Sequence, residues 1–514
     1  MTDQTLSLLP PMPILAAIDV GSNAMRLAVA SVDADRAPTF LEVIREPVRL
    51  GEDVFTKGVM GEETIDTAVA AFERFRAALD RHGVRWTRAV ATSAMREAMN
   101  RDILADRISQ ASGIDVEVIG AEEEARLIHL AVRTKVSLKN RVGLLVDIGG
   151  GSTEVTLASD EGILSAASFN MGSVRLLRTL GDYKNDERRV HQLIREYVDA
   201  AQQRIRREIG GRHIDVCVGT GGNVEVLGEL RKEILGKDRD TTLSAGDLDR
   251  ILKKLLALTY AERVQELQLR PDRADVIVPA AIILRKILQV GGVEDVEIPR
   301  VGLKDGLLLD MVEEFYGERR SVRREQVIAT AMQVGRKYQF DEQHAVTVSH
   351  HAVQLFDATR DLHNLGIEQR ILLEVAGLLH DIGTFISASD HHKHTQYLLQ
   401  MTPIVGLSDA QMAVVGNVAR YHRRSQPKPQ HEAYQALSSK ERVMVSKLAA
   451  LLRLADAMDT EHASKVRGFN VEYKKPKFTL RLDGEGDLLL EKWALTKKAQ
   501  MFEEVFNVRF AVAG

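Results

Sequence analysis

The chain has 514 residues, of which 45% are hydrophobic and 28% are charged, and its formal net charge is −4. This length predicts about three or four domains. No apolar run approaches the roughly 18 residues of a membrane-spanning helix, and the near-neutral charge does not point to nucleic acid. We therefore expect a cytoplasmic protein that has no signal peptide, no membrane partner and no specific nucleic acid partner. Its single cysteine, Cys217, excludes an intramolecular disulfide and is expected to be a small buried side chain rather than a nucleophile.

The first residues predict a β-hairpin over 14–32, with an extended stretch at 40–50 behind it. Apolar residues at helical spacing predict a helix over Glu62–Arg81. An apolar strand at 88–91 then leads into a Ser/Thr cap followed by Arg96. A capped helix N-terminus with an adjacent arginine is typical of a phosphate site, although the same pattern also describes an ordinary cap with a surface arginine.

A strand at 114–119 precedes a helix that begins with the acids Glu122, Glu123 and Glu124. Acids in the first turn complement the helix dipole, which is a sufficient reason for their presence. Helical spacing places Glu124 on the inward face with Leu127 and Ile128, whereas the other two acids point elsewhere. Glu124 is therefore the candidate for a general base.

The stretch 144–154 combines an apolar strand, the acid Asp147, three glycines, two hydroxyl residues and a second acid, Glu154. Glycines let backbone N–H groups approach a phosphate, and carboxylates suit Mg²⁺ or Mn²⁺. The same pattern occurs at 14–23 around Asp19, which predicts a duplicated α/β fold with both turns facing one cleft. A third glycine-rich turn follows an expected strand at 214–218. The predicted phosphate-binding residues are Asp19, Gly21, Ser22, Asn23, Arg96, Gly149, Gly150, Gly151, Ser152, Thr153, Gly219, Thr220, Gly221, Gly222 and Asn223.

Around that third turn, we expect strands at 142–146, 153–158 and 163–170, a helix opened by 171–175, a long helix at 186–209 and an apolar helix at 274–290. The last helix of this part is expected to end near residue 316. The charged run 318–324 is typical of a solvated domain boundary.

Beyond residue 324 the chain changes to helices rich in histidine. Lone histidines on apolar helix faces are usually core residues, but His344, His380, Asp381 and Asp456 form an imidazole and carboxylate set suited to a divalent metal. A local cluster of basic residues could bind along a polyanion, or it could be an ordinary solvated face. It consists of Arg420, His422, Arg423, Arg424 and Lys428.

The final segment predicts a small α+β cap. Its expected strands are at 469–473, 478–482, 488–490 and 507–512, and its helix is at 496–506.

These motifs, in this order, resemble the exopolyphosphatase/guanosine pentaphosphate phosphohydrolase (Ppx/GppA) family. The segments that carry the resemblance are 19–23, 91–98, 123–127, 147–154, 171–172 and 219–223. The resemblance implies an actin-like, ribonuclease-H-type α/β core, duplicated into lobes at 1–135 and 136–316. It also implies an all-α HD-like domain at 317–467, followed by the α+β domain at 468–514, and a homodimer.

On the resemblance, Glu124 is the base, Asp147 and Glu154 position metal and water, and the glycine turns with Arg96 hold phosphate. We expect an Mg²⁺-dependent exopolyphosphatase that removes terminal orthophosphate from polyphosphate. Hydrolysis of guanosine pentaphosphate to the tetraphosphate is the alternative within the same class.

Two other classes remain open: an actin-like ATP-binding kinase or chaperone, and a non-catalytic sensor of guanosine polyphosphates. A base at a helix start suits attack by water better than transfer to an acceptor hydroxyl. For the histidine set, a scaffold that extends the polyphosphate channel is favoured over a second metal site with its own phosphohydrolase activity.

Overall fold

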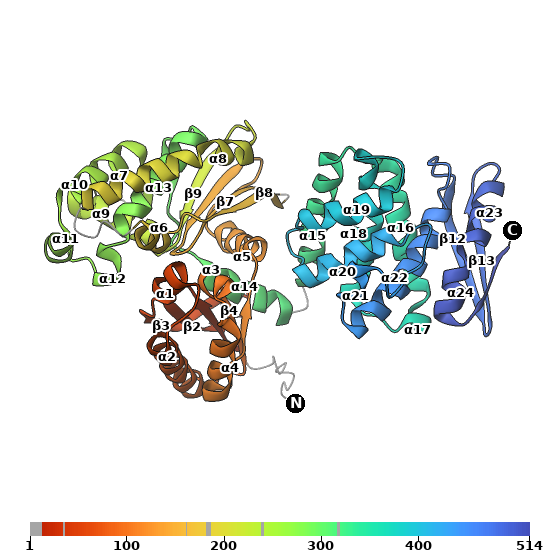
Figure 1. Cartoon of the computed structure of the whole chain (residues 1–514), viewed down its shortest axis with the longest axis horizontal. Helices are drawn as coiled ribbons and strands as arrows, with labels where there is room; N and C mark the ends of the chain where they lie inside the picture. Colours follow the sequence, from red (N-terminus) through yellow and green to blue (C-terminus); the bar gives the residue numbers. More distant parts are fainter. Residues whose placement is uncertain are drawn as a thin grey trace, which may run out of the picture. The chain divides into compact units, whose positions relative to one another are not determined.

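The computed structural model describes residues 13–33, 36–160, 162–180, 187–237, 241–315 and 319–513, with side chains in the last range from residue 324. The chain forms two compact units, which divide between Arg320 and Ser321 (Figure 1). This division falls within the predicted boundary run, whose first residue lies outside the described residues. The predicted helix end near residue 316 also lies outside them. The finer division into four domains stays a prediction.

The first sheet of the first unit has five strands in the order β3-β2-β1-β4-β5. Strands β1 and β2 form the predicted hairpin around the turn at 21–24. Helices α1 to α4 pack their apolar faces on one side of the sheet. The elements are β1 (Ile14–Val20), β2 (Met25–Val32), β3 (Pro38–Glu46), α1 (Leu50–Lys57), α2 (Glu62–Arg81), β4 (Trp86–Ala91), α3 (Ser93–Glu97), α4 (Arg101–Ser112), β5 (Val116–Val118) and α5 (Ala121–Arg133).

The second sheet has the order β10-β11-β9-β6-β7-β8, in which β8-β7-β6-β9-β11 repeats the plan of the first sheet. This repeat confirms the duplicated α/β core. The elements are β6 (Gly143–Ile148), β7 (Thr153–Ser159), β8 (Gly162–Phe169), α6 (Ser173–Thr179), α7 (Glu187–Ala200), α8 (Gln202–Ile209), β9 (Val216–Thr220), α9 (Gly222–Leu235), β10 (Thr242–Ser244), α10 (Ala245–Ala257), α11 (Tyr260–Glu266), α12 (Pro271–Ala274), α13 (Ile277–Gly291), β11 (Asp295–Glu297) and α14 (Leu303–Phe315).

Helices α5 and α14 join the two sheets through one shared core. Leu127 and Ala131 of α5 pack in a cluster that includes Leu15 of β1, Leu145 of β6 and Leu307 of α14. The inward face predicted for α5 is therefore real, and it is covered from both sheets. Because the helix is held on both sides, its N-terminal turn, which carries Glu124, has a defined position between the lobes.

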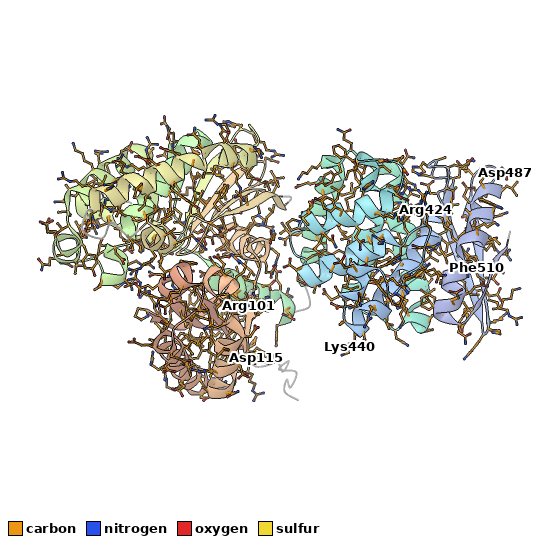
Figure 2. All side chains as sticks on the ribbon, viewed as in Figure 1. Arg101, Asp115, Arg424, Lys440, Asp487 and Phe510 are labelled. Carbon is orange, nitrogen blue, oxygen red and sulfur yellow. The ribbon has the colours of Figure 1, made fainter. Side chains whose placement is uncertain are left out.

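The second unit combines helices with a three-stranded sheet in the order β12-β13-β14. One continuous hydrophobic core runs through helices and strands alike, from Val327 to Val508. Polar side chains such as Arg424 and Lys440 lie on its surface (Figure 2). The elements are α15 (Arg319–Lys337), α16 (Glu342–Ala358), α17 (Arg360–His363), α18 (Ile367–Leu379), the 3₁₀ turn Ile382–Phe385, α19 (His391–Met401), α20 (Asp409–Arg420), α21 (Glu432–Gln435), α22 (Ser439–Ala457), β12 (Val466–Lys474), β13 (Lys477–Gly484), α23 (Leu489–Lys498), α24 (Gln500–Phe506) and β14 (Arg509–Ala513).

Several element predictions were wrong. Residues 488–490 are not a strand, because α23 begins at Leu489 with Leu488 as its N-cap residue. The N–H of Leu489 donates to the side chain of Asp487 at 2.9 Å. The helix predicted over 496–506 is divided between α23 and α24, and the one predicted over 186–209 is divided at Ala201. Residue 186 lies outside the described residues, and α1 was not predicted.

Cys217 is buried in β9, as predicted, and burial raises the pKa of its thiol to about 12. Within the described ranges, no helix has both the length and the apolar character needed to cross a membrane.

We predict that the buried carboxylate of Asp310 stabilises the junction of α14 with α5 and β4. Its two oxygens lie 2.8 Å from Arg126 Nη2 and 2.6 Å from Arg88 Nη1. Asp310→Ala leaves the buried guanidinium of Arg126 and the partly buried one of Arg88 without this partner, so the free energy of unfolding should fall by about 3–5 kcal/mol. Urea denaturation measures this. Asp80→Ala removes the carboxylate of an exposed pair with Arg76, and an equal loss in that control would contradict the assignment.

Candidate active site

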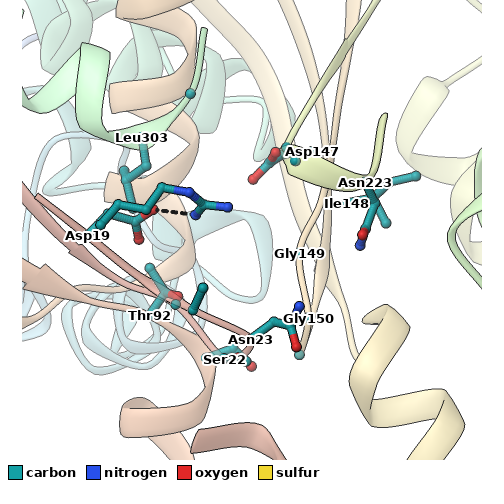
Figure 3. Close-up of a pocket in the computed structure, with 18 of the residues that line it drawn as sticks. Asp19, Ser22, Asn23, Thr92, Asp147, Ile148, Gly149, Gly150, Asn223 and Leu303 are labelled. Atoms are coloured by element: carbon teal, nitrogen blue, oxygen red, sulfur yellow. Dashed lines mark hydrogen bonds and ion pairs between the residues drawn. The ribbon is translucent and has the colours of Figure 1, made fainter. Parts of the chain in front are cut away.

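A cavity of about 250 Å³ opens between the two sheets of the first unit. Figure 3 shows Asp19, Ser22 and Asn23 on one side and Asp147, Gly149, Gly150 and Asn223 on the other. The side chains that line it are almost all polar, and backbone from all three predicted glycine-rich turns reaches it. The arrangement exposes many N–H groups to one small volume, which is the usual construction of an anion site.

The glycine turns of the two lobes lie against one another. A Cβ added to Gly150 would lie 3.1 Å from the Cβ of Ser22 and 3.4 Å from the backbone nitrogen of Asn23. The start of α6 fixes the second-lobe turn, because the N–H of Ser173 donates to Gly149 O at 3.1 Å and that of Val174 to Gly150 O at 2.9 Å. The two turns therefore face one cleft, as the sequence predicts.

The two lobes differ at one equivalent pair of positions. In the first hairpin, Asp19 lies opposite Arg26, and their side chains form an ion pair at 3.2 Å. In the second hairpin, Asp147 lies opposite Glu154. Two acids at directly opposite positions of an antiparallel pair repel each other. The first hairpin neutralises its acid with its own arginine. The second hairpin brings two negative charges together and has no cation of its own at this position.

Glu124 completes an acidic cluster with this pair. One carboxylate oxygen from each of Glu124, Asp147 and Glu154 lies within 4.8 Å of the others. Burial, and next the charge of Glu154, raises the pKa of Glu124 well above its ordinary value. Burial and then Glu154 also raise the pKa of Asp147 to about 7, and burial raises that of Glu154. A carboxylate with a raised pKa is a better proton acceptor near neutral pH.

These three residues fit a hard divalent cation such as Mg²⁺. Oε2 of Glu124 and Oε2 of Glu154 are buried and accept no hydrogen bond from the described residues. The oxygen ligands and their negative charge are those that Mg²⁺ prefers. Asp147 and Glu154 are the residues that would hold the ion, because their partner strands fix both side chains. Thr220 Oγ1 donates to Asp147 Oδ1 at 2.8 Å, and Ser168 Oγ donates to Glu154 Oε1 at 2.9 Å.

Cationic side chains line the same cavity as the acids. Arg273 is buried, and burial followed by the charges of Arg26 and Arg45 lowers its pKa to about 9. Its Nη1 donates to Asn223 Oδ1 at 2.6 Å, and its Nε has no hydrogen-bond partner. Crowded cations with an unsatisfied buried donor favour an anionic ligand.

Some predicted phosphate-binding residues lie away from the cavity wall. Thr153 donates its hydroxyl to Met171 O at 2.8 Å. Gly219 lies inside β9, where a Cβ would contact Val224 and Val296, and Thr220 acts through Asp147. Arg96 binds Ile119 O and lies 3.5 Å from Glu124 Oε2. The remaining predicted residues, Asp19, Gly21, Ser22, Asn23, Gly149, Gly150, Gly151, Ser152, Gly221, Gly222 and Asn223, line the cavity.

Several cavity residues were not predicted from the sequence. Arg26 follows the first turn on β2, so its position opposite Asp19 was a usable signal. Thr92 and Ser93 were noted only as a helix cap. Residues late in the unit reach the cavity through the tertiary path of the chain, and no local motif marks them. They are Arg273, Arg300 and Lys304.

In the second unit, the predicted metal set does converge. His344, His380 and Asp456 form one group of potential ligands, and Asp381, His391 and His422 form another. The predicted basic cluster does not form one surface. Arg420 donates to Gln396 Oε1 at 2.6 Å, His422 is buried, and Arg424 and Lys428 are exposed.

Comparison with known proteins gives one consistent result. The model of the Ppx/GppA phosphatase family matches residues 28–315, and that of Ppx/GppA phosphatase domain III matches residues 324–501. A guanosine-5'-triphosphate,3'-diphosphate pyrophosphatase of Vibrio vulnificus is 26% identical over 481 residues, which cover 92% of each chain. The crystal structure of an exopolyphosphatase from Cytophaga hutchinsonii is similar with a TM-score of 0.54 and 29% identity, covering 59% of this chain and 98% of that one. A Ppx/GppA family member of Aquifex aeolicus, 24% identical with a TM-score of 0.51, covers 59% and 99% and shares the fold.

We predict that Mg²⁺ stabilises the protein more at pH 8 than at pH 6. Because the pKa of Asp147 is raised to about 7, the folded protein without the ion holds a proton there at pH 6, which the cation must displace. The stabilisation should therefore grow through pH 7, by up to about 1.4 kcal/mol per pH unit. Thermal unfolding in MgCl₂ against EDTA at pH 6, 7 and 8 measures it. Asp147→Asn should lose most of this slope; an unchanged slope would contradict the prediction.

Proposed function

The chain belongs to the Ppx/GppA phosphatase family, whose members hydrolyse phosphoanhydride bonds, and on that premise we propose that it is an exopolyphosphatase. It would release orthophosphate from the end of inorganic polyphosphate. The observation that carries the proposal is the buried carboxylate of Glu124, which lies beside two further acids and lines the same cavity as the glycine turns.

Each element of the cavity has a part in this reaction. Backbone N–H groups of the glycine turns, with Arg26 and Arg273, bind and orient the terminal phosphates. Glu124 takes a proton from a water molecule as the water oxygen attacks the terminal phosphorus. The bond from that phosphorus to the bridging oxygen breaks, which gives orthophosphate and a chain one unit shorter. Mg²⁺ bound at Asp147 and Glu154 would neutralise the developing charge.

The composition of the cavity wall supports polyphosphate over a nucleotide. Among the described residues that line it, none is aromatic, so no ring is present on which a guanine base could stack. Glycine backbone, hydroxyl groups and cationic side chains predominate instead. A chain of phosphates offers only oxygen to such a wall, which needs only hydrogen-bond donors and positive charge.

Guanosine pentaphosphate is the second candidate substrate. The observation that favours it is the match to a relative named guanosine-5'-triphosphate,3'-diphosphate pyrophosphatase along 92% of the chain. The chemistry would be the same, with the terminal 5'-phosphate in the cavity and the nucleoside outside it. The homodimer expected from the family resemblance remains a prediction.

We predict that Glu124→Gln lowers kcat on polyphosphate by about 10²–10⁴-fold, because the amide cannot accept the proton from water. Polyphosphate binding, measured by calorimetry, should remain, since the turns and arginines are intact. Glu122→Gln is the matched control. It changes the same residue type two positions earlier, outside the wall of this cavity, and should keep full activity. Turnover retained in Glu124→Gln would refute the base assignment.

The preference between the two candidate substrates can be measured with one enzyme preparation. We expect kcat/KM for phosphate release from long-chain polyphosphate to exceed that for guanosine pentaphosphate by at least about tenfold, because the wall binds phosphates and gives a base no ring to stack on. Phosphate release assayed under the same Mg²⁺ concentration gives both values. The reverse order would make the nucleotide the substrate while leaving the role of Glu124 unchanged.

A further inference from the structure

The second unit contains a second cluster of side chains that could ligate metal, made by α16, α19, α22 and the turns that follow α18 and α20. It consists of His344, His380, Asp381, His391, His422 and Asp456. We propose that this cluster binds two divalent transition-metal ions bridged by Asp381 and hydrolyses phosphate esters. This goes beyond the polyphosphatase reaction of the first unit and uses none of its residues.

The first ion would lie between His344 and His380. Nδ1 of His380 is 2.7 Å from Gly377 O, and Nδ1 of His344 is 2.8 Å from Asp459 Oδ2. Since both partners are acceptors, each Nδ1 carries the hydrogen and each Nε2 presents a lone pair. These two Nε2 atoms face each other at 3.3 Å.

The second pair of histidines repeats this arrangement. Nδ1 of His422 is 2.7 Å from Ala419 O, and Nδ1 of His391 is 3.2 Å from Ala388 O. Their Nε2 atoms again face each other at 3.3 Å. Two nitrogens that each lie about 2.1 Å from one ion at tetrahedral to octahedral angles are roughly 3.0–3.4 Å apart. Both spacings therefore match ligands on a common ion.

Asp381 is placed to join the two positions. Its Oδ1 lies 3.0 Å from His391 Nε2, 3.4 Å from His422 Nε2 and 3.7 Å from His380 Nε2. Asp456 completes the first group, with Oδ1 3.7 Å from His380 Nε2 and 3.8 Å from His344 Nε2. A carboxylate between two pairs of imidazoles is the arrangement of a bridged dinuclear site.

The surroundings of the cluster favour a phosphate group as the ligand of the metal pair. Arg423 Nη1 lies 3.1 Å from His391 Nε2, and Lys498 pairs with Asp456. Two divalent ions carry more positive charge than the carboxylates Asp381, Asp456 and Asp459 neutralise, and these two cations add to the excess. The side chain of Asp381 is 22% exposed, so solvent reaches this residue. Its Oδ1 is itself buried and has no hydrogen-bond partner among the described residues, as expected of an atom that faces a cation.

Imidazole ligands suit transition metals such as Fe²⁺ and Zn²⁺ better than Mg²⁺, and the carboxylates of the same cluster suit Mn²⁺, so Mn²⁺ serves as the test ion. A water bound to such a pair loses a proton near neutral pH, and the hydroxide attacks the phosphorus of a phosphate ester. The bond from phosphorus to the ester oxygen breaks. That oxygen leaves as an alcohol after it takes a proton from solvent, and the phosphate keeps the oxygen of the hydroxide.

The first test is the Mn²⁺ content of the full chain, stripped with EDTA and dialysed against Mn²⁺ in excess Mg²⁺. Elemental analysis should find two tightly held Mn²⁺ per chain, with the spin-coupled electron paramagnetic resonance spectrum of a bridged pair. His422→Ala should retain about one, and Asp381→Asn at most one without coupling. His350→Ala, an exposed histidine on α16, should retain two. Fewer than two ions in the wild type, or two in Asp381→Asn, would overturn the proposal.

The second test separates the two sites by working in the Glu124→Gln background. Mn²⁺-dependent hydrolysis of p-nitrophenyl phosphate and bis(p-nitrophenyl) phosphate should persist there, and adding Asp381→Asn should reduce it at least about 100-fold. Adding His350→Ala should change it little. If two Mn²⁺ bind but neither ester is hydrolysed, the hydrolytic role is wrong. Failure of Glu124→Gln to affect polyphosphate turnover would count against the first site alone.

Discussion

The first unit depends on burying three carboxylates within a few ångströms of one another. Asp147 and Glu154 face each other across a hairpin, and Glu124 reaches them from α5. Like charges in a site that excludes water repel strongly, so this arrangement is stable only with protons or a cation among them. The raised pKa of each group reflects this constraint. The cationic side chains that line the same cavity, of which Arg273 is buried, create the reverse demand, which an anionic ligand such as phosphate would meet.

The duplication of the fold explains why the two sides of the cavity differ in charge. Both hairpins end an inner strand with an acid and a glycine turn, but Arg26 neutralises Asp19 in the first lobe, whereas Glu154 adds charge to Asp147 in the second. The repeat therefore has one position for a cation rather than two. Helix α5 packs on both sheets, so Glu124 at its N-terminus is positioned by the same core that joins the lobes.

The elements predicted correctly from the sequence are those with a local signature. Hairpins and glycine turns are marked by composition, and Glu124 could be selected because its helix has one apolar face. Arg273 and Lys304 could not be found, since they reach the cavity only through the path of α12 and the first turn of α14. Residues 488–490 were mistaken for a strand because a short leucine run has no periodicity that separates strand from helix.

In the second unit, spacing along the chain marked four candidate ligands but not His391 and His422. Nothing in the sequence indicates that α19 and the turn after α20 direct these two side chains to the same oxygen of Asp381. The comparison between the clusters is informative about chemistry. The first offers only oxygen atoms and needs a protein base, since Mg²⁺ acidifies water weakly. The second uses its carboxylates as ligands and hydrogen-bond partners, so an attacking hydroxide would have to come from metal-bound water. Transition metals bound by imidazole provide hydroxide at neutral pH. Hydrolysis at the second cluster would therefore not need a general base like Glu124, and none is present among its described ligands.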